Sequence, residues 1–318
     1  AGVAAMREAG ALPPRSWFCG HSVGEYSALS ALTHVLPLDA LIDVVYQRGL
    51  TMQRFVDRDE MGRSDYAMGV IRPHKAKMRG EDAKALVAEV AKETGLPLYV
   101  VNHNVRDRQY AVAGHLKACE TIRKRLLTRA EDGGAWIQIP GIDVPFHSPL
   151  LSDGVAAFRD VLTKCIPMDI DIARLEGRYI PNLVAMPFER TPEFVDAMEK
   201  ATGYAGVAEL KKNIAERGRD ILIELLAWQF ASPVRWITTQ DILGSVVDQV
   251  IEIGPGAAPV VSNMLRSSLR KANRVPTILH AERDYDVVVG NGPEEEEAAP
   301  APTAEAAASA PAAAAPAP

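Results

Sequence analysis

A serine between two glycines is the clearest nucleophile in this chain. Residues 20–24 read Gly-His-Ser-Val-Gly, which is a G-x-S-x-G pattern with Ser22 at its centre. In a nucleophile elbow such a serine lies on a sharp strand-to-helix turn, and the glycines let the backbone pass close by. The N–H of Val23 and the helix N-terminus would then face charge that develops on an attacked carbonyl. The pattern predicts a Ser22 nucleophile with Val23 as an oxyanion donor.

A serine nucleophile needs a general base, and histidine is the usual one. His147 stands out among seven histidines because an apolar strand ends there against prolines, which places the ring on a stiff loop at the carboxyl edge of a sheet. His21 adjoins Ser22 but would point off the other side of the turn, so we expect it to shape the elbow. Four further histidines have surface-like neighbours and are interpreted as ordinary exposed side chains: His34, His74, His115 and His280.

Arg48 interrupts the apolar face of a helix predicted over 38–55. A buried guanidinium needs a planar anionic partner, because an unpaired buried charge is costly. Two partners remain open at this point: a protein carboxylate in a structural salt bridge, or a substrate carboxylate held in a bidentate clamp. Asn102, Asn104 and Gln109 surround an inter-strand turn, and they are either ordinary turn residues or side chains that face a cleft.

The elements that must position these residues alternate between strand and helix. Residues 15–19 predict a buried strand and 25–32 the helix that follows the elbow. This alternation predicts an α/β fold with a mostly parallel sheet covered by helices, resembling the α/β-hydrolase arrangement. Further helices are expected at 152–162, 191–202, 208–217, 220–228 and 239–246, and further strands at 179–184 and 250–253.

Residues 66–139 have an alternation of their own. Strands predicted at 66–71, 98–102, 110–113 and 135–139, with helices at 81–93 and 116–127, give the order β-α-β-β-α-β. That order predicts a ferredoxin-like subdomain inserted into a larger one, although the same strands could instead extend the main sheet. The predicted domains are therefore 1–65 with 140–290, and the insertion 66–139.

Composition bounds the class of protein. The chain has 318 residues and a net charge of −6, most of which comes from Glu294–Glu297 and Glu305. The nearly neutral remainder has no basic patch for nucleic acid or an anionic membrane. Three unpaired-looking cysteines and the lack of a signal or spanning segment favour a reduced, cytoplasmic protein and predict no zinc site. Residues 291–318 predict a Glu/Ala/Pro linker, and both ends of the chain look cut from a longer polypeptide.

Several motifs in fixed order resemble one family, the malonyl/acetyl-CoA:acyl-carrier-protein transacylases. They are Gly-His-Ser-Val-Gly-Glu at 20–25, Gln-Arg-Gly at 47–49 with Met-Gln at 52–53, Val-Pro-Phe-His-Ser at 144–148, Ser-Pro-Val-Arg-Trp at 232–236 and Glu-Ile-Gly-Pro-Gly at 252–256. Segments at 59–66, 101–114, 141–148 and 179–183 resemble the malonyl/palmitoyl transferase domain of fungal and actinobacterial type I fatty acid synthases. The resemblance covers about residues 18–253.

This resemblance implies roles for individual residues. It makes Ser22 the nucleophile, His147 the general base and acid, and Gln229 the residue whose backbone carbonyl orients the histidine. It also implies that Arg48 pairs with the malonyl carboxylate. Substrate-binding residues implied beside Arg48 are Gln53, Asn102 and Phe146, whose ring narrows the space beside the malonyl α-carbon.

The resemblance further implies ping-pong acyl transfer. A CoA thioester acylates Ser22, and the phosphopantetheine thiol of an acyl carrier protein then takes the acyl group. It implies malonyl-CoA as donor, palmitoyl transfer back from carrier to CoA, other synthase domains as partners, and no tightly bound cofactor. The family's upstream Gly-Gln-Gly motif, the source of a second oxyanion donor, is absent from this sequence, so the expectation is a weakly active or inactive fragment whose core lacks a strand.

Two rival functions remain open from the sequence. A serine hydrolase or thioesterase would have an Asp acting on His147 and no role for Arg48. A non-catalytic scaffold segment of a synthase would not form an acyl-serine at all.

Overall fold

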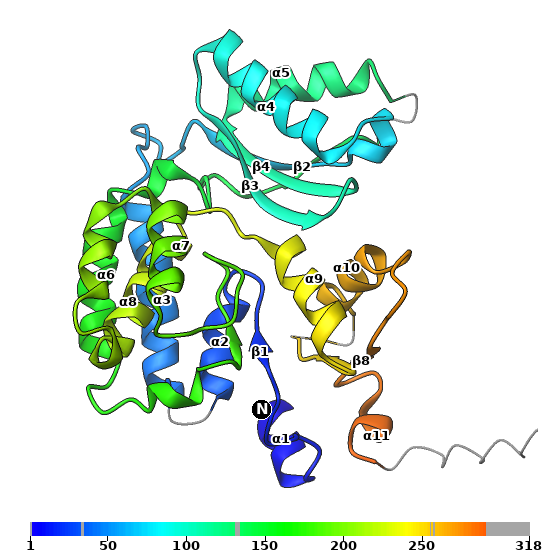
Figure 1. Ribbon diagram of the computed structural model, residues 1–318. Helices are drawn as coiled ribbons and strands as arrows, with labels where there is room; N and C mark the ends of the chain where they lie inside the picture. The colour runs from blue at the N-terminus through cyan, green and yellow to red at the C-terminus, as the bar shows by residue number, and fades with distance from the viewer. Residues whose placement is uncertain (1, 33–34, 131–133, 255, 257, 291–318) are drawn as a thin grey trace, which may run out of the picture.

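The computed structural model describes residues 2–32, 35–130, 134–254, 256 and 258–290. Predictions made for Ala1, His34, Pro255 and the acidic linker at 291–318 lie outside these residues. Figure 1 shows a helical body, a sheet-and-helix unit above it, and a smaller unit beside it built from α9, α10 and the β7–β8 pair. The expected mixture of strands and helices is present.

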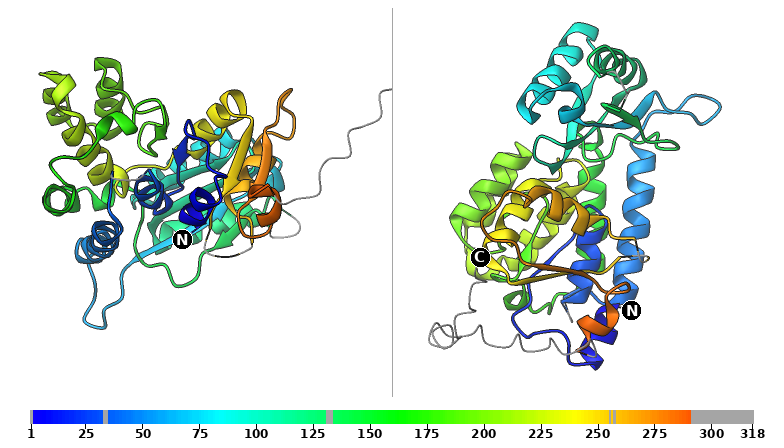
Figure 2. Two further views of the ribbon diagram at one scale, coloured as in Figure 1. Left: turned by 90° about the horizontal axis from the view of Figure 1, so that it is seen from below. Right: turned by 90° about the vertical axis from the view of Figure 1, so that its right-hand side faces the viewer.

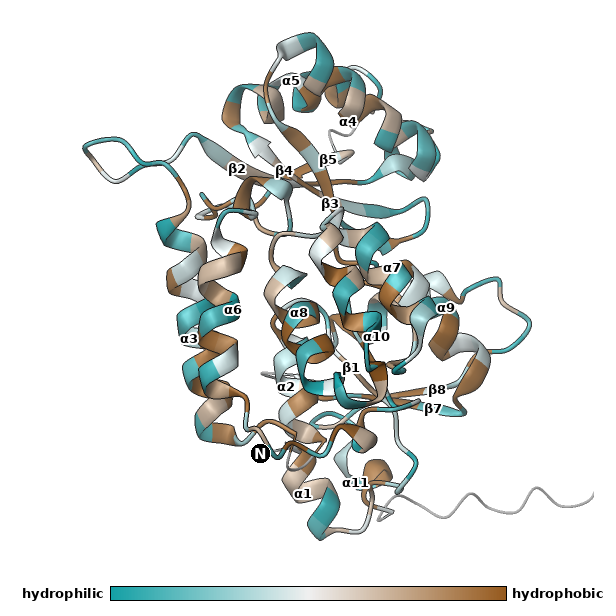
Figure 3. Ribbon diagram, turned by 60° about the vertical axis from the view of Figure 1, so that its left-hand side comes forward, coloured by the Kyte–Doolittle hydropathy of each residue, from teal (hydrophilic) through white to brown (hydrophobic). Residues whose placement is uncertain are grey.

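The larger body is mostly helical around one short parallel strand pair. Its first segments are α1 (Gly2–Glu8), β1 (Phe18–Cys19), α2 (Gly24–Ala31) and α3 (Leu38–Arg54). After the inserted unit come η2 (Pro149–Leu151), α6 (Gly154–Cys165), η3 (Ile172–Arg174), β6 (Tyr179–Ile180), α7 (Pro192–Thr202), η4 (Ala205–Lys211), η5 (Ile214–Glu216) and α8 (Gly218–Gln229). Figure 3 shows α3 and α6 running side by side.

The parallel strands are shorter than the sequence predicts. β1 and β6 pair over only two residues each, Phe18 with Tyr179 and Cys19 with Ile180. The strand predicted over 179–184 ends early because Pro181 has no N–H to continue the ladder, and its carbonyl instead accepts from the N–H of Ala185. Within the described residues, parallel strands thus form separate two-stranded pairs rather than one broad sheet.

One predicted helix is wrong. Residues 208–217 form parts of two short 3-10 segments, η4 and η5, instead of an α-helix. Asn213 lies between them with a φ of +55°, a left-handed conformation that cannot continue a right-handed helix.

The unit over 66–138 has the element order that the sequence predicts. β2 (Tyr66–Ile71), η1 (Pro73–Ala76), α4 (Gly80–Thr94), β3 (Leu98–Val105), β4 (Gln109–His115), α5 (Leu116–Leu127) and β5 (Trp136–Gln138) follow one another. The sheet order is β3-β4-β2-β5, with every neighbouring pair antiparallel. In Figure 1, α4 and α5 cover the face of this sheet that points away from the body. The other face therefore lies toward the body.

The last described elements are α9 (Trp236–Val246), β7 (Gln249–Glu252), α10 (Val261–Ser268), β8 (Thr277–His280) and α11 (Tyr285–Val288). β7 and β8 form a second parallel pair. Figure 2 shows α11 and α1 at the same end of the molecule. No helix among the described residues combines the length and apolar character needed to cross a bilayer.

Two apolar cores stabilise these units. The larger core joins α2, α3, α6 and α8, with Tyr26, Leu29 and Phe158 fully buried in it. The second core lies between α4, α5 and the four-stranded sheet, where Ile71, Val90 and Ile122 are fully buried. The candidate site lies where these two units meet, since His21 beside the elbow contacts Asn102 and Asn104 of β3.

Candidate active site

Ser22 lies on a tight turn between β1 and α2. Its φ is +53°, a left-handed conformation that is uncommon outside glycine. Gly20 makes the turn possible, since a Cβ there would lie 2.0 Å from the carbonyl oxygen of Gly24. This is the geometry of a nucleophile elbow, and it exposes the Ser22 hydroxyl at the start of α2.

Asn182 ties the elbow to the loop after β6. Its Oδ1 accepts from the N–H of Ser22 at 2.8 Å, and its Nδ2 donates to the carbonyl of Gly20 at 2.6 Å. Asn182 is 1 % exposed. Asn182 belongs to a motif at 179–183 with no role implied for it, and the structure shows that it holds both sides of the strained turn.

His147 faces Ser22. Its Nε2 lies 2.7 Å from the Ser22 Oγ, and its Nδ1 lies 2.9 Å from the carbonyl oxygen of Gln229. A carbonyl only accepts, so Nδ1 carries the proton and Nε2 presents a lone pair to the serine hydroxyl. Burial, reinforced by the nearby Arg48 charge, lowers the pKa of His147 to about 3. The imidazole is therefore neutral near pH 7 and able to accept a proton.

The end of α8 supplies the acceptors that orient His147. Gln229 is the last residue of α8 and Phe230 follows it, so their carbonyls have no partner within the helix. The carbonyl of Gln229 accepts from the His147 ring, and the carbonyl of Phe230 accepts from the His147 backbone N–H at 2.7 Å. These two bonds hold His147 at a φ of +61°, a second left-handed residue in the site.

Arg48 projects from the buried face of α3. Val44, Arg48, Thr51 and Met52 share that face at helical spacing. Arg48 is 6 % exposed; its Nη2 donates to Gln229 Oε1 at 3.0 Å, and its guanidinium lies 5.5 Å from the centre of the Tyr26 ring. Its buried Nε has no hydrogen-bond partner among the residues that the structure describes. No carboxylate of the described residues lies within ion-pair distance of the Arg48 guanidinium. This finding argues against a structural salt bridge, one of the two partners that the sequence allows for Arg48.

Glu25 is a buried carboxylate that the sequence analysis did not assign. Its Oε2 accepts from Gln229 Nε2 at 2.7 Å and from the N–H of Asn182 at 3.3 Å, and its Oε1 accepts from the hydroxyl of Tyr179. Burial raises the pKa of Glu25 to about 7, although these hydrogen bonds and the Arg48 charge oppose the rise. An acid in the first turn of a helix usually complements the helix dipole at the surface, so its position alone does not predict burial.

Val23 is open at the start of α2. Its side chain is 47 % exposed, and within the described part of the chain no acceptor takes its N–H. The N–H is therefore free to donate to an oxyanion.

Phe146 is half-buried and packs against both the larger core and a small cluster on the sheet around Val101.

Asn102 and Gln53 differ in where they lie. Asn102 is buried on β3, its Nδ2 is 3.4 Å from Nε2 of His21, and its Oδ1 has no partner. Gln53 is exposed, and its Oε1 accepts from Arg58 at 2.6 Å. Gln53 follows Arg48 by five residues, which places it about 140° around the helix from that side chain. The structure gives the substrate-binding role no support at Gln53.

His21 is held away from the reacting atoms, as the sequence predicts. Its Nε2 lies 2.8 Å from Asn104 Oδ1, and its ring packs edge-on against Trp236 at a centroid distance of 5.4 Å. It joins the elbow to β3. One further expectation is wrong: His280 is fully buried on β8, where its Nδ1 accepts backbone N–H groups from the turn that follows.

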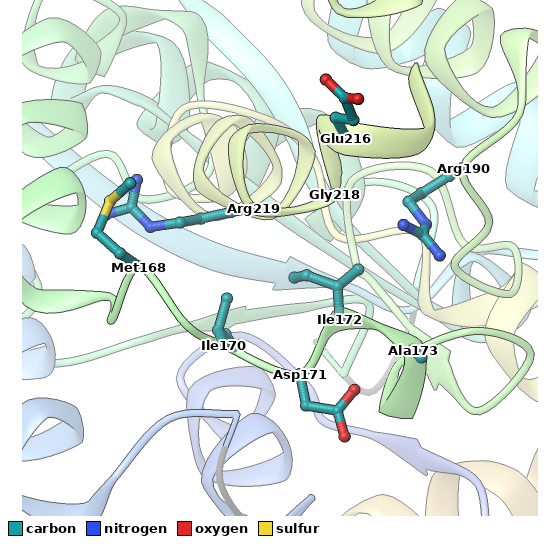
Figure 4. A pocket seen from close by; sticks show the side chains of 9 residues that line it. All are labelled: Met168, Ile170, Asp171, Ile172, Ala173, Arg190, Glu216, Gly218 and Arg219. Carbon is teal, nitrogen blue, oxygen red and sulfur yellow. The ribbon is translucent and has the colours of Figure 1, made fainter. Parts of the chain in front are cut away.

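A surface cavity between η3 and the start of α8 lies apart from this site (Figure 4). Its two arginines already have partners: Arg190 pairs with Glu176, and Arg219 donates to the carbonyls of Ile166 and Pro167. None of its lining residues contributes to the elbow or to the histidine. Within the described residues, no group of three or more His, Cys, Asp or Glu side chains could hold a metal ion.

Comparisons with known proteins show which sequences and structures this chain is similar to. The sequence model of the family described as acyl transferase domain matches residues 1–132. A fatty acid synthase subunit beta of Schizosaccharomyces pombe is 36 % identical over 256 residues, which is 65 % of this chain and 12 % of that protein. The chain thus spans about an eighth of the length of this curated relative.

Solved structures share the fold. The malonyl CoA-acyl carrier protein transacylase of Coxiella burnetii superposes with a TM-score of 0.63 at 21 % identity, over 91 % of this chain and 76 % of that one. A malonyl-transacylase in complex with its type II PKS acyl-carrier protein gives a TM-score of 0.61 at 22 % identity, over 88 % and 72 %. Residues 1–132 thus match the acyl transferase model, the chain is similar to a segment of fungal fatty acid synthase beta subunits, and its fold is that of the malonyl transacylases.

Proposed function

We propose that this chain transfers malonyl groups from CoA to the phosphopantetheine thiol of an acyl carrier protein through an acyl-Ser22 intermediate. The observation that carries the proposal is a neutral His147 hydrogen-bonded to Ser22, beside a buried Arg48 that has no carboxylate partner among the described residues. The first pair supports acyl transfer, and the second supports an acyl group that brings its own carboxylate.

The acylation step uses the geometry directly. His147 Nε2 takes the Ser22 proton as Oγ attacks the thioester carbonyl, and the N–H of Val23 donates to the oxyanion. The carbonyl of Gln229 stabilises the imidazolium through Nδ1–H. Collapse of the tetrahedral intermediate breaks the C–S bond, and the CoA sulfur leaves with the proton that His147 held.

The transfer step repeats these events with a thiol as nucleophile. His147 takes the proton of the phosphopantetheine thiol, and the sulfur attacks the ester carbonyl of acyl-Ser22. Collapse breaks the C–O bond, and Ser22 recovers the proton from His147. The reaction is a transfer rather than a hydrolysis when water is kept from the ester, and the buried surroundings of His147 and Arg48 favour that outcome.

Arg48 would determine which acyl group is accepted. A malonyl carboxylate would supply the planar anion that the described residues do not bring to the Arg48 guanidinium, and its unpartnered Nε leaves donor capacity for such a ligand. A palmitoyl group has no carboxylate, so its return from carrier to CoA would proceed without an ion pair to Arg48.

The partners and the domain division belong to the same proposal. The neighbour solved with its acyl-carrier protein supports a carrier as acceptor, and the synthase relatives support a place in a larger assembly. We propose residues 1–65 with 140–290 as the acyltransferase subdomain and 66–139 as the ferredoxin-like subdomain. The free thiols of Cys19, Cys119 and Cys165 support a reduced compartment such as the cytoplasm.

The hydrolase rival fits the site less well. A Ser–Asp–His triad would place an Asp carboxylate on Nδ1 of His147, where the structure places the carbonyl of Gln229. Incubation of the protein with malonyl-CoA, followed by mass spectrometry, separates the two functions. The proposal expects a malonyl ester on Ser22 that a phosphopantetheine thiol removes. Rapid release of free malonate with no thiol present would support the hydrolase instead.

A further inference from the structure

The side chain of Gln229 is a separate feature from its backbone carbonyl. Its Nε2 donates to the carbonyl of Ser22 at 2.8 Å and to Glu25 at 2.7 Å, while its Oε1 accepts from Arg48. The amide has one orientation that satisfies all three contacts. If it were turned over, Nε2 would face a cation that only donates, and Oε1 would face two acceptors.

Glu25 fixes that orientation. Its carboxylate is fully buried and accepts from Gln229 Nε2, Tyr179 and the Asn182 N–H, so it has no donor of its own to offer while ionised. In this orientation Gln229 Oε1, which bears a partial negative charge, faces Arg48 and accepts a hydrogen bond from its Nη2. Arg48 is thereby anchored at one nitrogen without receiving an ion pair, which leaves its full charge for a ligand.

We propose that Glu25 and the Gln229 side chain are positioning residues that hold the Arg48 guanidinium ready for a carboxylated acyl group. This inference rests on the proposed function, because it concerns how the same site selects its acyl donor. Gln229 then has two separable tasks. Its backbone carbonyl orients His147 for the chemistry, and its side chain orients Arg48 for recognition of the acyl group.

Gln229→Met separates these tasks. Methionine keeps the length of the side chain and the backbone carbonyl on His147, and it removes the amide. The rate of covalent loading of Ser22 is measured against malonyl-CoA concentration. We expect the half-saturating concentration to rise about 10- to 100-fold, as expected when a hydrogen bond to a charged group is lost, while the maximal loading rate stays within about threefold.

Two further variants test Glu25. Glu25→Ala removes the anchor, and we expect it to raise the half-saturating concentration as well. Glu25→Gln should restore it, because its amide oxygen can accept from Gln229 and Asn182 while its nitrogen donates to the hydroxyl of Tyr179. Gln240→Met is the matched control: Gln240 is also fully buried with three side-chain hydrogen bonds, but it lies on α9 beside Asn104.

The outcomes are distinguishable. A rise in half-saturating concentration for Gln229→Met and Glu25→Ala, with Gln240→Met and Glu25→Gln close to wild type, supports the inference. A fall in the maximal rate at unchanged half-saturation, or equal effects in Gln240→Met, overturns it and leaves the proposed function standing. If the wild-type protein forms no malonyl-Ser22, the proposed function fails and the inference fails with it. Thermal unfolding of each variant verifies that it is folded.

Discussion

Replacing Arg48 with methionine should remove function without removing stability. In the structure the substitution deletes one hydrogen bond to Gln229, worth about 1.5–3 kcal/mol for a charged donor. It also deletes the contact with the Tyr26 ring, worth about 0.5–1 kcal/mol. Against these losses, it removes a buried cation without an ion pair and an unpartnered Nε, which relieves about 1–3 kcal/mol. At the middle of these ranges, the free energy of unfolding should therefore fall by about 1 kcal/mol.

The same substitution should be severe for malonyl transfer. Two charge-assisted hydrogen bonds to a substrate carboxylate are worth about 3–5 kcal/mol together, which corresponds to a fall in kcat/KM for malonyl-CoA of roughly 10²- to 10⁴-fold. Acetyl-CoA has no carboxylate, so its loading rate should change by less than about tenfold. The assay compares acyl-Ser22 formation from the two donors by mass spectrometry, alongside a urea unfolding curve for each protein.

A different pattern would refute this reasoning. If Arg48→Met lost about 3–5 kcal/mol of stability, as expected when one partner of a buried ion pair is removed, Arg48 would be a structural charge. Equal losses for malonyl-CoA and acetyl-CoA would lead to the same conclusion. Either result would leave the identity of the acyl donor without support.

Three further predictions concern the elbow and the buried titratable groups. Gly20→Ala should cost at least about 3 kcal/mol of stability and abolish acylation, because its Cβ would meet backbone at 2.0 Å, whereas Gly24→Ala, with nothing within 4 Å, should change stability by less than about 1 kcal/mol. His147, whose pKa is lowered to about 3, should stay neutral and support acylation of Ser22 down to about pH 5. The measurement uses the Glu25→Gln variant, because the pKa of Glu25 is itself raised to about 7. A loss of the acylation rate below about pH 6.5 in that variant would contradict the argument that burial keeps His147 neutral. The pKa of Glu25 is raised to about 7, so its protonated form stabilises the fold and that contribution is lost as pH rises through about 7. The free energy of unfolding of the wild type should therefore fall relative to Glu25→Gln, on the order of 1–2 kcal/mol, between about pH 6 and pH 8, and parallel pH curves would contradict the prediction.

The sequence predicted the Ser22–His147 pairing better than the network that holds the pair. Ser22 and His147 could be singled out from the sequence, because a tight turn requires glycine and a stiff loop contains proline. The element order over 66–138 could be predicted, because the spacing of apolar residues differs clearly between the helices and the strands there. Gln229 was assigned by resemblance alone, since a carbonyl at a helix end has no residue-specific signal.

Tertiary burial explains most of what the sequence did not predict. Glu25 follows the elbow directly, yet a first-turn acid reads as a surface residue until the fold brings Tyr179 and Gln229 against it. His280 looked exposed for the same reason. Gln53 could have been questioned from the sequence, because five residues along a helix place it far around the axis from Arg48.

The most direct test is to identify the residue that malonyl-CoA acylates. The protein, incubated with malonyl-CoA and then digested, should yield a malonyl ester on the peptide that contains Ser22, and a phosphopantetheine thiol should remove it. The Ser22→Ala variant should carry no ester. An ester at another residue, or free malonate formed without an acyl-Ser22, would contradict the claim that Ser22 and His147 form an acyl-transfer site.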